Sequence, residues 1–334
     1  MTMREMGKRL GVSAVTVSKA LSGKPGVSEA VRQQILRLAE EVGYVNPHQR
    51  SDAPGNGLDV GILVMEHFFS TDGFYAMLTK QLSQLLSESG HFGVLEVITQ
   101  EMQRDMVLPK LLRSRRVRAL ILLGQPQEGY TRMLSAQPLP VVALDFHNPA
   151  IPMDAVVGDS VYGAAMMTRC LIENGHRDIG FLGNVKATSS ILERYLGFVA
   201  EMRLHELPIR PECVLPDRTD DNRVTPPTLP ERMPTAFVCN CDVVARAFVD
   251  QLQKSGYRVP EDVSIVSYDD FGHVPGALPL TTFRVDTAAM CRIAVQLVES
   301  RCRGDMQPFT RIVVPGECIY RNSVYPLYPQ STNQ

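Results

Sequence analysis

The sequence has no run of about 18 apolar residues, the length that a membrane-spanning helix needs, and we expect no membrane partner. Its first residues contain no apolar core of a secretion signal, which favours a cytoplasmic protein. The seven cysteines are scattered and form no C-x-x-C spacing. This pattern is typical of reduced thiols and argues against a disulfide framework or a zinc site.

Sequence motifs of catalysis are absent as well. The chain holds no P-loop, G-x-S-x-G, H-E-x-x-H or EF-hand string, and its seven histidines form no i,i+4 pair. Asp269 and Asp270 are adjacent, which is poor support for two carboxylates that face each other across a cleft. We therefore predict that the protein is not an enzyme and that it uses no cofactor and no metal.

Positive charge is concentrated at the amino end. Residues 1–50 carry eight Lys and Arg against four Asp and Glu, whereas the remaining residues carry 26 against 32. A basic segment followed by an acidic body indicates that only the amino-terminal segment contacts a polyanion such as DNA.

Residues 1–46 have the pattern of three short helices. Thr2 and Glu5 have the spacing of a capping box at the start of the first helix. Ser13 is placed to cap a second helix, and Ser28 to cap a third. Two short helices joined by a glycine-containing turn, with a third helix bracing them, predict a small all-α helix-turn-helix DNA-binding domain.

The second helix of such a domain reads base edges in the major groove. Ala14 and Val15 are suited to thymine methyl groups, and Lys19 to the O6 and N7 acceptors of guanine. The predicted DNA-binding residues of this segment are Thr2, Ser13, Ala14, Val15, Thr16, Ser18, Lys19, Ser22, Ser28 and Tyr44. For any one of them the alternative is helix capping or a solvated side chain, but the agreement of caps, turn, core spacing and charge favours DNA binding.

The amino-terminal segment resembles the DNA-binding signature of the LacI/GalR family of bacterial transcriptional regulators in the string MGKRLGVSAVTVSKALSG, residues 6–23. Residues 27–44 resemble the third helix of the same family and end in its usual Gly-Tyr. The resemblance implies a regulator that binds a DNA operator and responds to a small effector.

Residues 47–57 are polar and rich in turn formers, which predicts a linker. Members of the family usually carry a hinge helix here, with a leucine that inserts into the minor groove. This sequence has no leucine after residue 38 until residue 58, and Pro54 with Gly55 opposes a helix. Arg50 is a candidate for a narrow minor groove, and the alternative is a flexible tether with one solvated arginine.

From residue 58 to residue 325, apolar β-rich runs alternate with helical patterns, one of which covers residues 102–112. The alternation predicts an α/β core of two doubly wound parallel-sheet lobes. This core resembles the periplasmic-binding-protein-like core of the same family, which implies chain crossings near residues 157, 285 and 314. The predicted limits are 1–46 for the DNA-binding domain, 47–57 for the linker, 58–157 and 285–313 for the N-lobe, 158–284 and 314–325 for the C-lobe, and 326–334 for a tail.

Ligands of open parallel sheets bind beyond the carboxyl ends of the strands. Four predicted strands carry an aspartate at that point, namely Asp145, Asp159, Asp242 and Asp269. Carboxylates accept hydrogen bonds from hydroxyl groups, and arginine donates in a two-pronged fork, so a sugar suits such a site. The alternative for the first three aspartates is capping of the helices that follow.

The family resemblance adds further candidates. Ser190 and Arg194 match the family pattern S-x-x-x-R-x-x-G, in which the arginine and often the serine face the effector. Cys241 occupies the position of a usual asparagine, so the hydrogen bond made there is lost or moved to Asn240. The predicted effector-binding residues are Phe74, Asp145, Ser190, Arg194, Asn240, Asp242 and Asp269. The alternatives are an ion pair on a solvated helix face for the arginine and a core position for the phenylalanine.

These patterns together predict a sequence-specific DNA-binding regulator, and a repressor is the favoured kind. An effector bound between the lobes changes its affinity for the operator. We expect a homodimer on a palindromic double-stranded operator, because one small head makes too few contacts for useful specificity. A sugar is the favoured effector, and a purine or a phosphorylated sugar is the alternative. A solute-binding protein without a role at DNA is a rival of another class, against which the basic head argues.

Overall fold

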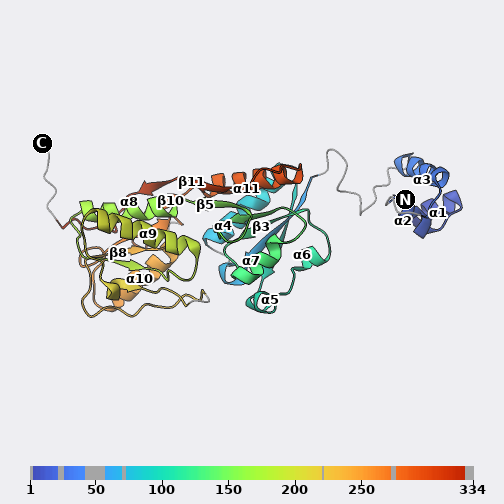
Figure 1. Ribbon diagram of the computed structural model, residues 1–334. Coiled ribbons are helices and arrows are strands. Elements are labelled where there is room, and N and C mark those ends of the chain that lie inside the picture. Colours follow the sequence, from blue (N-terminus) through green and yellow to red (C-terminus); the bar gives the residue numbers. More distant parts are fainter. Residues whose placement is uncertain are drawn as a thin grey trace. The chain divides into compact units, whose positions relative to one another are not determined.

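The computed structural model describes residues 3–21, 26–41, 57–69, 73–219, 222–271 and 276–327. The chain divides into a small amino-terminal unit and a large core, and each is described by itself (Figure 1). The predicted DNA contacts that lie outside the described residues are Thr2, Ser22, Tyr44 and Arg50. The same holds for residues 47–56 of the predicted linker and residues 328–334 of the predicted tail.

The described residues of the amino-terminal unit form three helices, as the sequence pattern predicts. They are α1 (Met3–Leu10), α2 (Ala14–Leu21) and α3 (Glu29–Glu41). Each helix contributes to a shared apolar core, in which Met6, Val17 and Ile35 are fully buried. Gly7 lets α1 approach the next turn closely, since a Cβ there would lie 2.6 Å from the carbonyl oxygen of Val12. This core determines which face α2 leaves exposed.

The described residues of the large unit form two six-stranded sheets, one in each lobe (Figure 1). The N-lobe sheet is parallel and has the order β11-β5-β4-β3-β1-β2. Its strands are β1 (Asp59–Met65), β2 (Phe92–Ile98), β3 (Ala119–Leu123), β4 (Val141–Leu144), β5 (Asp154–Gly158) and β11 (Arg311–Val314). The C-lobe sheet has the order β12-β10-β9-β8-β6-β7, with β12 antiparallel to β10. Its strands are β6 (Ile179–Leu182), β7 (Val214–Leu215), β8 (Ala236–Cys239), β9 (Ser264–Asp269), β10 (Thr281–Val285) and β12 (Gly316–Ile319).

Helices cover both faces of each sheet, which explains why central strands such as β3 and β4 are apolar and buried at every residue. In the N-lobe, one face carries α4 (Phe74–Glu88) and α11 (Thr287–Cys302), and the other α5 (Gln100–Arg104), α6 (Lys110–Arg113) and α7 (Glu128–Ser135) (Figure 1). In the C-lobe, one face carries α8 (Ser160–Glu173) and α9 (Ser189–Leu204), and the other α10 (Asp242–Lys254). Every helix within the described ranges is too short or too polar to cross a bilayer.

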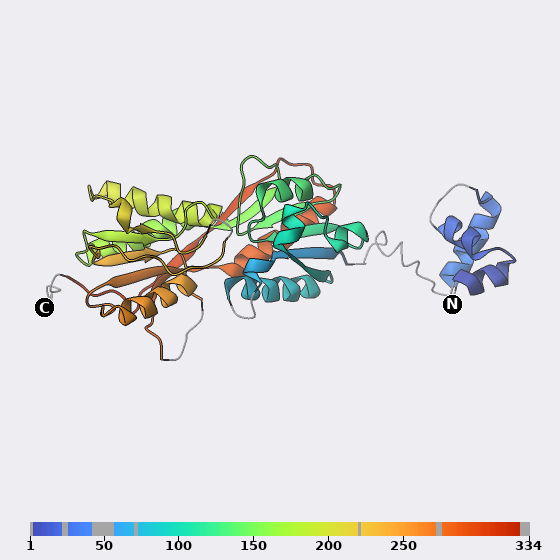
Figure 2. The same cartoon turned by 90° about the horizontal axis from the view of Figure 1, so that it is seen from below.

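The chain crosses between the lobes three times. It passes from β5 into α8, from β10 into α11, and from β11 into β12. The last crossing is the red segment that runs from one lobe into the other in Figure 2. Each sheet therefore contains a strand from the last part of the chain.

Residues 102–112 do not form the single helix that their pattern predicts, so this prediction is wrong. The structure has two short helices instead, α5 and α6. Met106 adopts a positive φ of 55° between them, and Pro109 cannot continue a helix and precedes α6 as its N-cap residue.

The helices α8 and α9 pack closely at Gly197, where a Cβ would collide with the carbonyl oxygen of Val161. We expect Gly197→Ala to lower the free energy of unfolding by about 1–3 kcal/mol or more, because the backbone of α8 must move. The control is Gly129→Ala on α7, where the nearest neighbour of an added Cβ, the Sδ atom of Met106, lies 3.9 Å away. That change is expected to be neutral or to stabilise by up to about 1 kcal/mol. Urea unfolding measures both variants, and equal midpoints would contradict the close packing.

Candidate functional site

The exposed face of α2 is the first candidate site. The hydroxyl oxygen of Ser13 accepts a hydrogen bond from the backbone N–H of Thr16 at 3.0 Å, and the two side-chain hydroxyls are hydrogen-bonded at 2.9 Å. Ser13 therefore caps α2, as its alternative reading predicts. A phosphate contact by the same residue stays a prediction.

The helix α2 buries one face in the core of its unit and leaves the other accessible. The side chain of Val15 is 65% exposed, and Lys19 is exposed as well. The remaining predicted contacts in the described part of this unit are half-buried or exposed: Ala14, Thr16, Ser18 and Ser28. Small, apolar and cationic side chains on one accessible helix have the chemistry that base edges in the major groove require.

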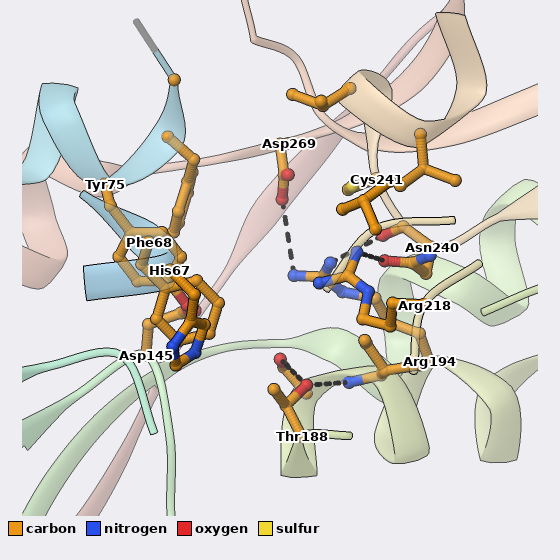
Figure 3. Close-up of a pocket in the computed structure, with 17 residues that line it drawn as sticks. His67, Phe68, Tyr75, Asp145, Thr188, Arg194, Arg218, Asn240, Cys241 and Asp269 are labelled. Carbon is orange, nitrogen blue, oxygen red and sulfur yellow. Dashed lines mark hydrogen bonds and ion pairs between the residues drawn. The ribbon is translucent and has the colours of Figure 1, made fainter. Parts of the chain in front are cut away.

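The second candidate site is a cavity of about 190 Å³ in the core, where residues at the carboxyl ends of strands from both lobes meet. The N-lobe supplies His67, Phe68, Gly73, Phe74, Tyr75 and Asp145. The C-lobe supplies Thr188, Ser190, Ile191, Arg194, Arg218, Val224, Asn240, Cys241, Val243, Val244 and Asp269. Figure 3 shows the N-lobe aromatic side chains across the cavity from two C-lobe arginines. An apolar wall with a few convergent polar groups is the usual form of a small-molecule site.

Arg194, on α9, is the central cation of this cavity. Its side chain is buried, its Nη1 donates to the carbonyl oxygen of Asn240 at 2.6 Å, and its Nη2 lies 3.4 Å from Oδ1 of Asp269. The guanidinium also lies over the ring of Tyr268, with 3.8 Å from Cζ to the ring centroid. Its Nε is buried without a hydrogen-bond partner among the described residues. Such a buried donor favours an acceptor supplied by a ligand.

A second arginine, Arg218, comes from the loop after β7. Its Nη2 lies 2.6 Å from Oδ2 of Asp217 and donates to Oδ1 of Asn240 at 3.4 Å. Asn240 in turn donates from Nδ2 to Asp217 at 2.8 Å and to the carbonyl oxygen of Leu182 at 3.0 Å. Asn240 thus orients both arginines, Arg194 through its backbone and Arg218 through its side chain (Figure 3).

The N-lobe wall of the cavity is aromatic. Phe68 and Tyr75 stack with ring centroids 4.3 Å apart, and Phe74 meets Tyr75 edge-on at 5.4 Å. The hydroxyl of Tyr75 donates to Oδ2 of Asp145 at 2.7 Å. A buried carboxylate is therefore held beside two stacked rings.

Burial controls the protonation of the cavity carboxyls. Desolvation raises the pKa of Asp269 to about 8; the guanidinium of Arg194 opposes this shift, and the charges of Asp242 and Asp145 add to it. Desolvation also raises the pKa of Asp145, against the effects of Arg194 and of the hydrogen bond from Tyr75. Carboxyls whose pKa is raised in this way are typical of functional sites.

Asp242 does not line the cavity, which corrects its predicted position. It is 1% exposed, and its carboxylate accepts hydrogen bonds from the hydroxyls of Ser267 and Thr282 and from the backbone N–H of Phe271. These bonds tie the start of α10 to β9 and β10. Asp159 caps α8 by accepting a backbone N–H at 3.2 Å, as its capping alternative predicts.

The structure brings the other six predicted effector contacts to the cavity: Phe74, Asp145, Ser190, Arg194, Asn240 and Asp269. Arg218 lies outside the predicted set, because it belongs to an irregular loop with no motif. Tyr75 has a signal in the sequence, since it follows Phe74 in an aromatic pair after the first strand. Among the described residues, no group of three His, Cys, Asp or Glu side chains is arranged to hold a metal ion.

Family models match two parts of the chain. Residues 2–46 match the bacterial regulatory proteins of the lacI family, and residues 168–324 match the periplasmic binding protein-like domain. The chain therefore combines a lacI-family helix-turn-helix region with a periplasmic-binding-protein-like domain. The family and the fold class predicted from the resemblance are therefore confirmed.

Curated relatives align with this chain over nearly its whole length. A ribose operon repressor from Haemophilus influenzae is 24% identical over 333 residues, which cover 98% of this chain and 99% of the relative. The HTH-type transcriptional repressor PurR from Vibrio parahaemolyticus is 26% identical over 333 residues, which cover 97% of this chain and 98% of the relative.

Solved structures share the LacI-type fold. The transcriptional regulator CelR in complex with cellobiose has a TM-score of 0.67 and 24% identity, and the match covers 97% of this chain and 99% of that chain. The lac repressor dimer bound to operator and the anti-inducer ONPF has a TM-score of 0.65 and 18% identity, with the same coverage.

Proposed function

We propose that this protein is a homodimeric transcriptional repressor of the LacI type. Its affinity for a palindromic operator depends on whether a small neutral sugar is bound in the core cavity. In this proposal residues 1–46 read DNA, residues 47–57 link, and the two lobes with the limits given above enclose the effector. The single observation that carries the effector site is Arg194, a buried arginine with an unpartnered Nε opposite an aromatic wall.

The operator side of the proposal assigns roles within the amino-terminal unit. Ala14, Val15, Ser18 and Lys19 read bases, and the hydroxyls of Thr16 and Ser28 contact phosphates. The accessible face of α2 supports this assignment, as does the similarity to relatives named as operon or transcriptional repressors. The fold likeness to a lac repressor dimer on its operator supports the two-fold arrangement.

The charges around the cavity favour a neutral effector. Arg218 is already paired with Asp217, and the charge of Arg194 is balanced when one of the two nearby carboxyls, Asp145 or Asp269, is ionised. A phosphate group would meet these carboxylates as like charges. Sugar hydroxyls, in contrast, donate to carboxylates and accept from guanidinium groups. A volume of about 190 Å³ also suits a small ligand.

A purine is the second candidate effector. The stacked pair Phe68 and Tyr75 offers an aromatic face to a planar ring, and a relative of this chain is a repressor named PurR. A purine and a sugar differ in what they need from the site, since the flat base relies on stacking and the sugar on Arg194 and Asp269.

A thermal-shift panel on the full chain discriminates the effectors. The probes are ribose, glucose, cellobiose, guanine and ribose 5-phosphate. We expect one of the neutral sugars to raise the melting temperature, since a ligand at a hundred times its Kd adds about 2.7 kcal/mol to stability. Stabilisation by guanine alone would replace the sugar by a purine, and stabilisation by the phosphorylated sugar alone would contradict the charge argument.

Gel shifts on fragments of genomic DNA test the operator side. We expect the full chain to retard particular fragments at salt concentrations where random duplexes run free, with retardation changed by the effector. A solute-binding protein without a role at DNA would retard none of them. That result would end the proposal of a repressor.

The pKa of Asp269 makes effector binding depend on pH. Its value of about 8 means that the carboxyl loses its proton as the pH rises through 8. If a sugar hydroxyl donates to the carboxylate, affinity increases with pH and is roughly tenfold higher at pH 9 than at pH 7. Titration calorimetry measures this change. The control is Asp269→Asn, whose side chain cannot ionise and which should bind the sugar weakly at both pH values. If the affinity of the wild type is also independent of pH, Asp269 does not accept a hydrogen bond from the ligand.

A further inference from the structure

A dense group of cations lies on the N-lobe, outside both sites described above. This arginine cluster consists of Lys110, Arg113, Arg115, Arg116 and Arg118, all of which are exposed. No Asp or Glu occurs between residues 106 and 127, although the chain beyond residue 50 has more acidic than basic residues. Such a concentration of one charge on an acidic body indicates a surface that binds an anion.

Three arginines of the cluster are not used for pairing within the described part of the chain. Arg113, Arg115 and Arg116 have no carboxylate partner there. The nearby carboxylate of Glu96 instead accepts the backbone N–H groups of Lys110 and Leu111, at 2.6 and 2.9 Å. These three arginines therefore remain available to a partner.

The position of the cluster in the fold is informative. The backbone N–H of Arg118 donates to the carbonyl oxygen of Asp59 at 2.8 Å, and β1 and β3 run parallel from there, with Val60 opposite Ala119. Asp59 is the first residue of β1, where the chain enters the core from the DNA-binding segment. The cluster thus lies at the amino ends of the N-lobe strands, whereas the effector cavity is at their carboxyl ends.

The surface beside the cluster is hollowed. A depression of about 720 Å³ is lined by Leu112, Arg115, Arg118, Pro140 and Arg301, among other residues. Of these, Arg301 is committed to Asp154, with bonds of 2.7 and 2.9 Å. Lys110, Arg113 and Arg116 do not line this depression, so the positive charge of the cluster is spread along residues 110–118 rather than enclosed in one pocket, which favours a polymeric anion over a small one.

We propose that the arginine cluster is a second DNA-contact surface, which binds the phosphate backbone next to the half-site read by α2. This inference rests on the proposed function. Arginine binds phosphate strongly and without regard to sequence, and phosphate contacts dominate the affinity of DNA-binding proteins.

The test is the salt dependence of DNA binding by the full chain. The probe is a duplex that carries the best sequence from an in vitro selection, and a duplex of scrambled sequence is measured beside it. Arg115→Gln/Arg116→Gln is expected to reduce the slope of log K against log salt by about 0.9 for each phosphate that is no longer neutralised, and so by about 2 per protomer. Affinity should fall by a similar factor for both duplexes, because the cluster reads no bases.

The matched control removes two arginines elsewhere. Arg203→Gln/Arg232→Gln takes the same charge from exposed positions of the C-lobe and is expected to keep the wild-type slope. Arg115→Lys/Arg116→Lys keeps the charge and should retain most of the slope, which separates a phosphate contact from a change in folding.

The outcomes separate this inference from the proposed function. A double glutamine variant that binds the selected duplex with an unchanged slope overturns the second surface and leaves the operator reader intact. Thermal stabilisation of the wild type by inorganic phosphate, lost in that variant while the slope stays unchanged, assigns the cluster to a small anion and also overturns it. A wild type without preference for any duplex overturns the proposed function and the second surface together.

Discussion

Replacing Arg194 by glutamine is expected to reduce effector affinity by about 10- to 150-fold, because the charge-assisted hydrogen bond that its Nε would donate to the effector, worth about 1.5–3 kcal/mol, is lost from a buried cavity. Operator binding in the absence of effector should persist, since α2 belongs to the other unit of the chain. Calorimetric titration with the sugar identified in the thermal-shift panel measures the first effect. Gel shifts with and without that sugar measure the second.

The control for this variant is Arg203→Gln, an exposed arginine on the same helix that should leave effector affinity unchanged. Loss of Arg194 leaves Asp269 buried without its cation, so the pKa of this carboxyl, already about 8, is expected to rise further. The double variant Arg194→Gln/Asp269→Asn replaces both ionisable groups and so tests effector binding without an unpaired buried carboxyl. Unchanged affinity in either variant, once circular dichroism shows that it is folded, would mean that Arg194 does not hold the effector.

The second large effect is expected from Lys19→Ala on α2. Removing a base-reading side chain costs about 1–3 kcal/mol, or about 5- to 150-fold, for each head, and a dimer incurs this cost twice. The preference for one base pair in each half-site should relax at the same time. Quantitative gel shifts against a set of operators with single base-pair changes measure both quantities.

Lys8→Ala is the matched control, because it removes the same charge from an exposed position of α1 in the same unit. It should weaken binding to all operators alike, without a change in their ranking. If Lys19→Ala also leaves the ranking unchanged, Lys19 contacts phosphate or solvent rather than a base.

Much of the fold can be predicted from the sequence, because buried parallel strands leave a plain signal. The strands β3 and β8 are uninterrupted apolar runs between turn residues. The edge strand β11 has no such signal, since Val313 is 44% exposed, Arg311 is exposed as well, and Val314 alone of its four residues is buried. The prediction from local sequence is also wrong at α5 and α6. The spacing of apolar residues there favours one helix, but Pro109 separates two short ones.

The candidate site can be predicted only in part. The rule that ligands lie beyond the carboxyl ends of strands locates Asp145 and Asp269. It also selects Asp242, whose true surroundings depend on Ser267 and Thr282 from strands far away in the sequence. Arg218 reaches the cavity because Asp217 and Asn240 hold its guanidinium there. The spacing of residues in the sequence does not predict the contact between Arg218 and Asn240.

The three passages of the chain between the lobes have a consequence for synthesis on the ribosome. Within the core, residues 59–158 are translated first, yet the sheet that they build lacks its edge strand until residues 311–314 have been translated. A chain that stops before residue 311 lacks an edge strand in each sheet, because β11 and β12 are close neighbours in the sequence. We therefore expect incomplete chains to be less stable than the full chain and to be degraded more readily by proteases.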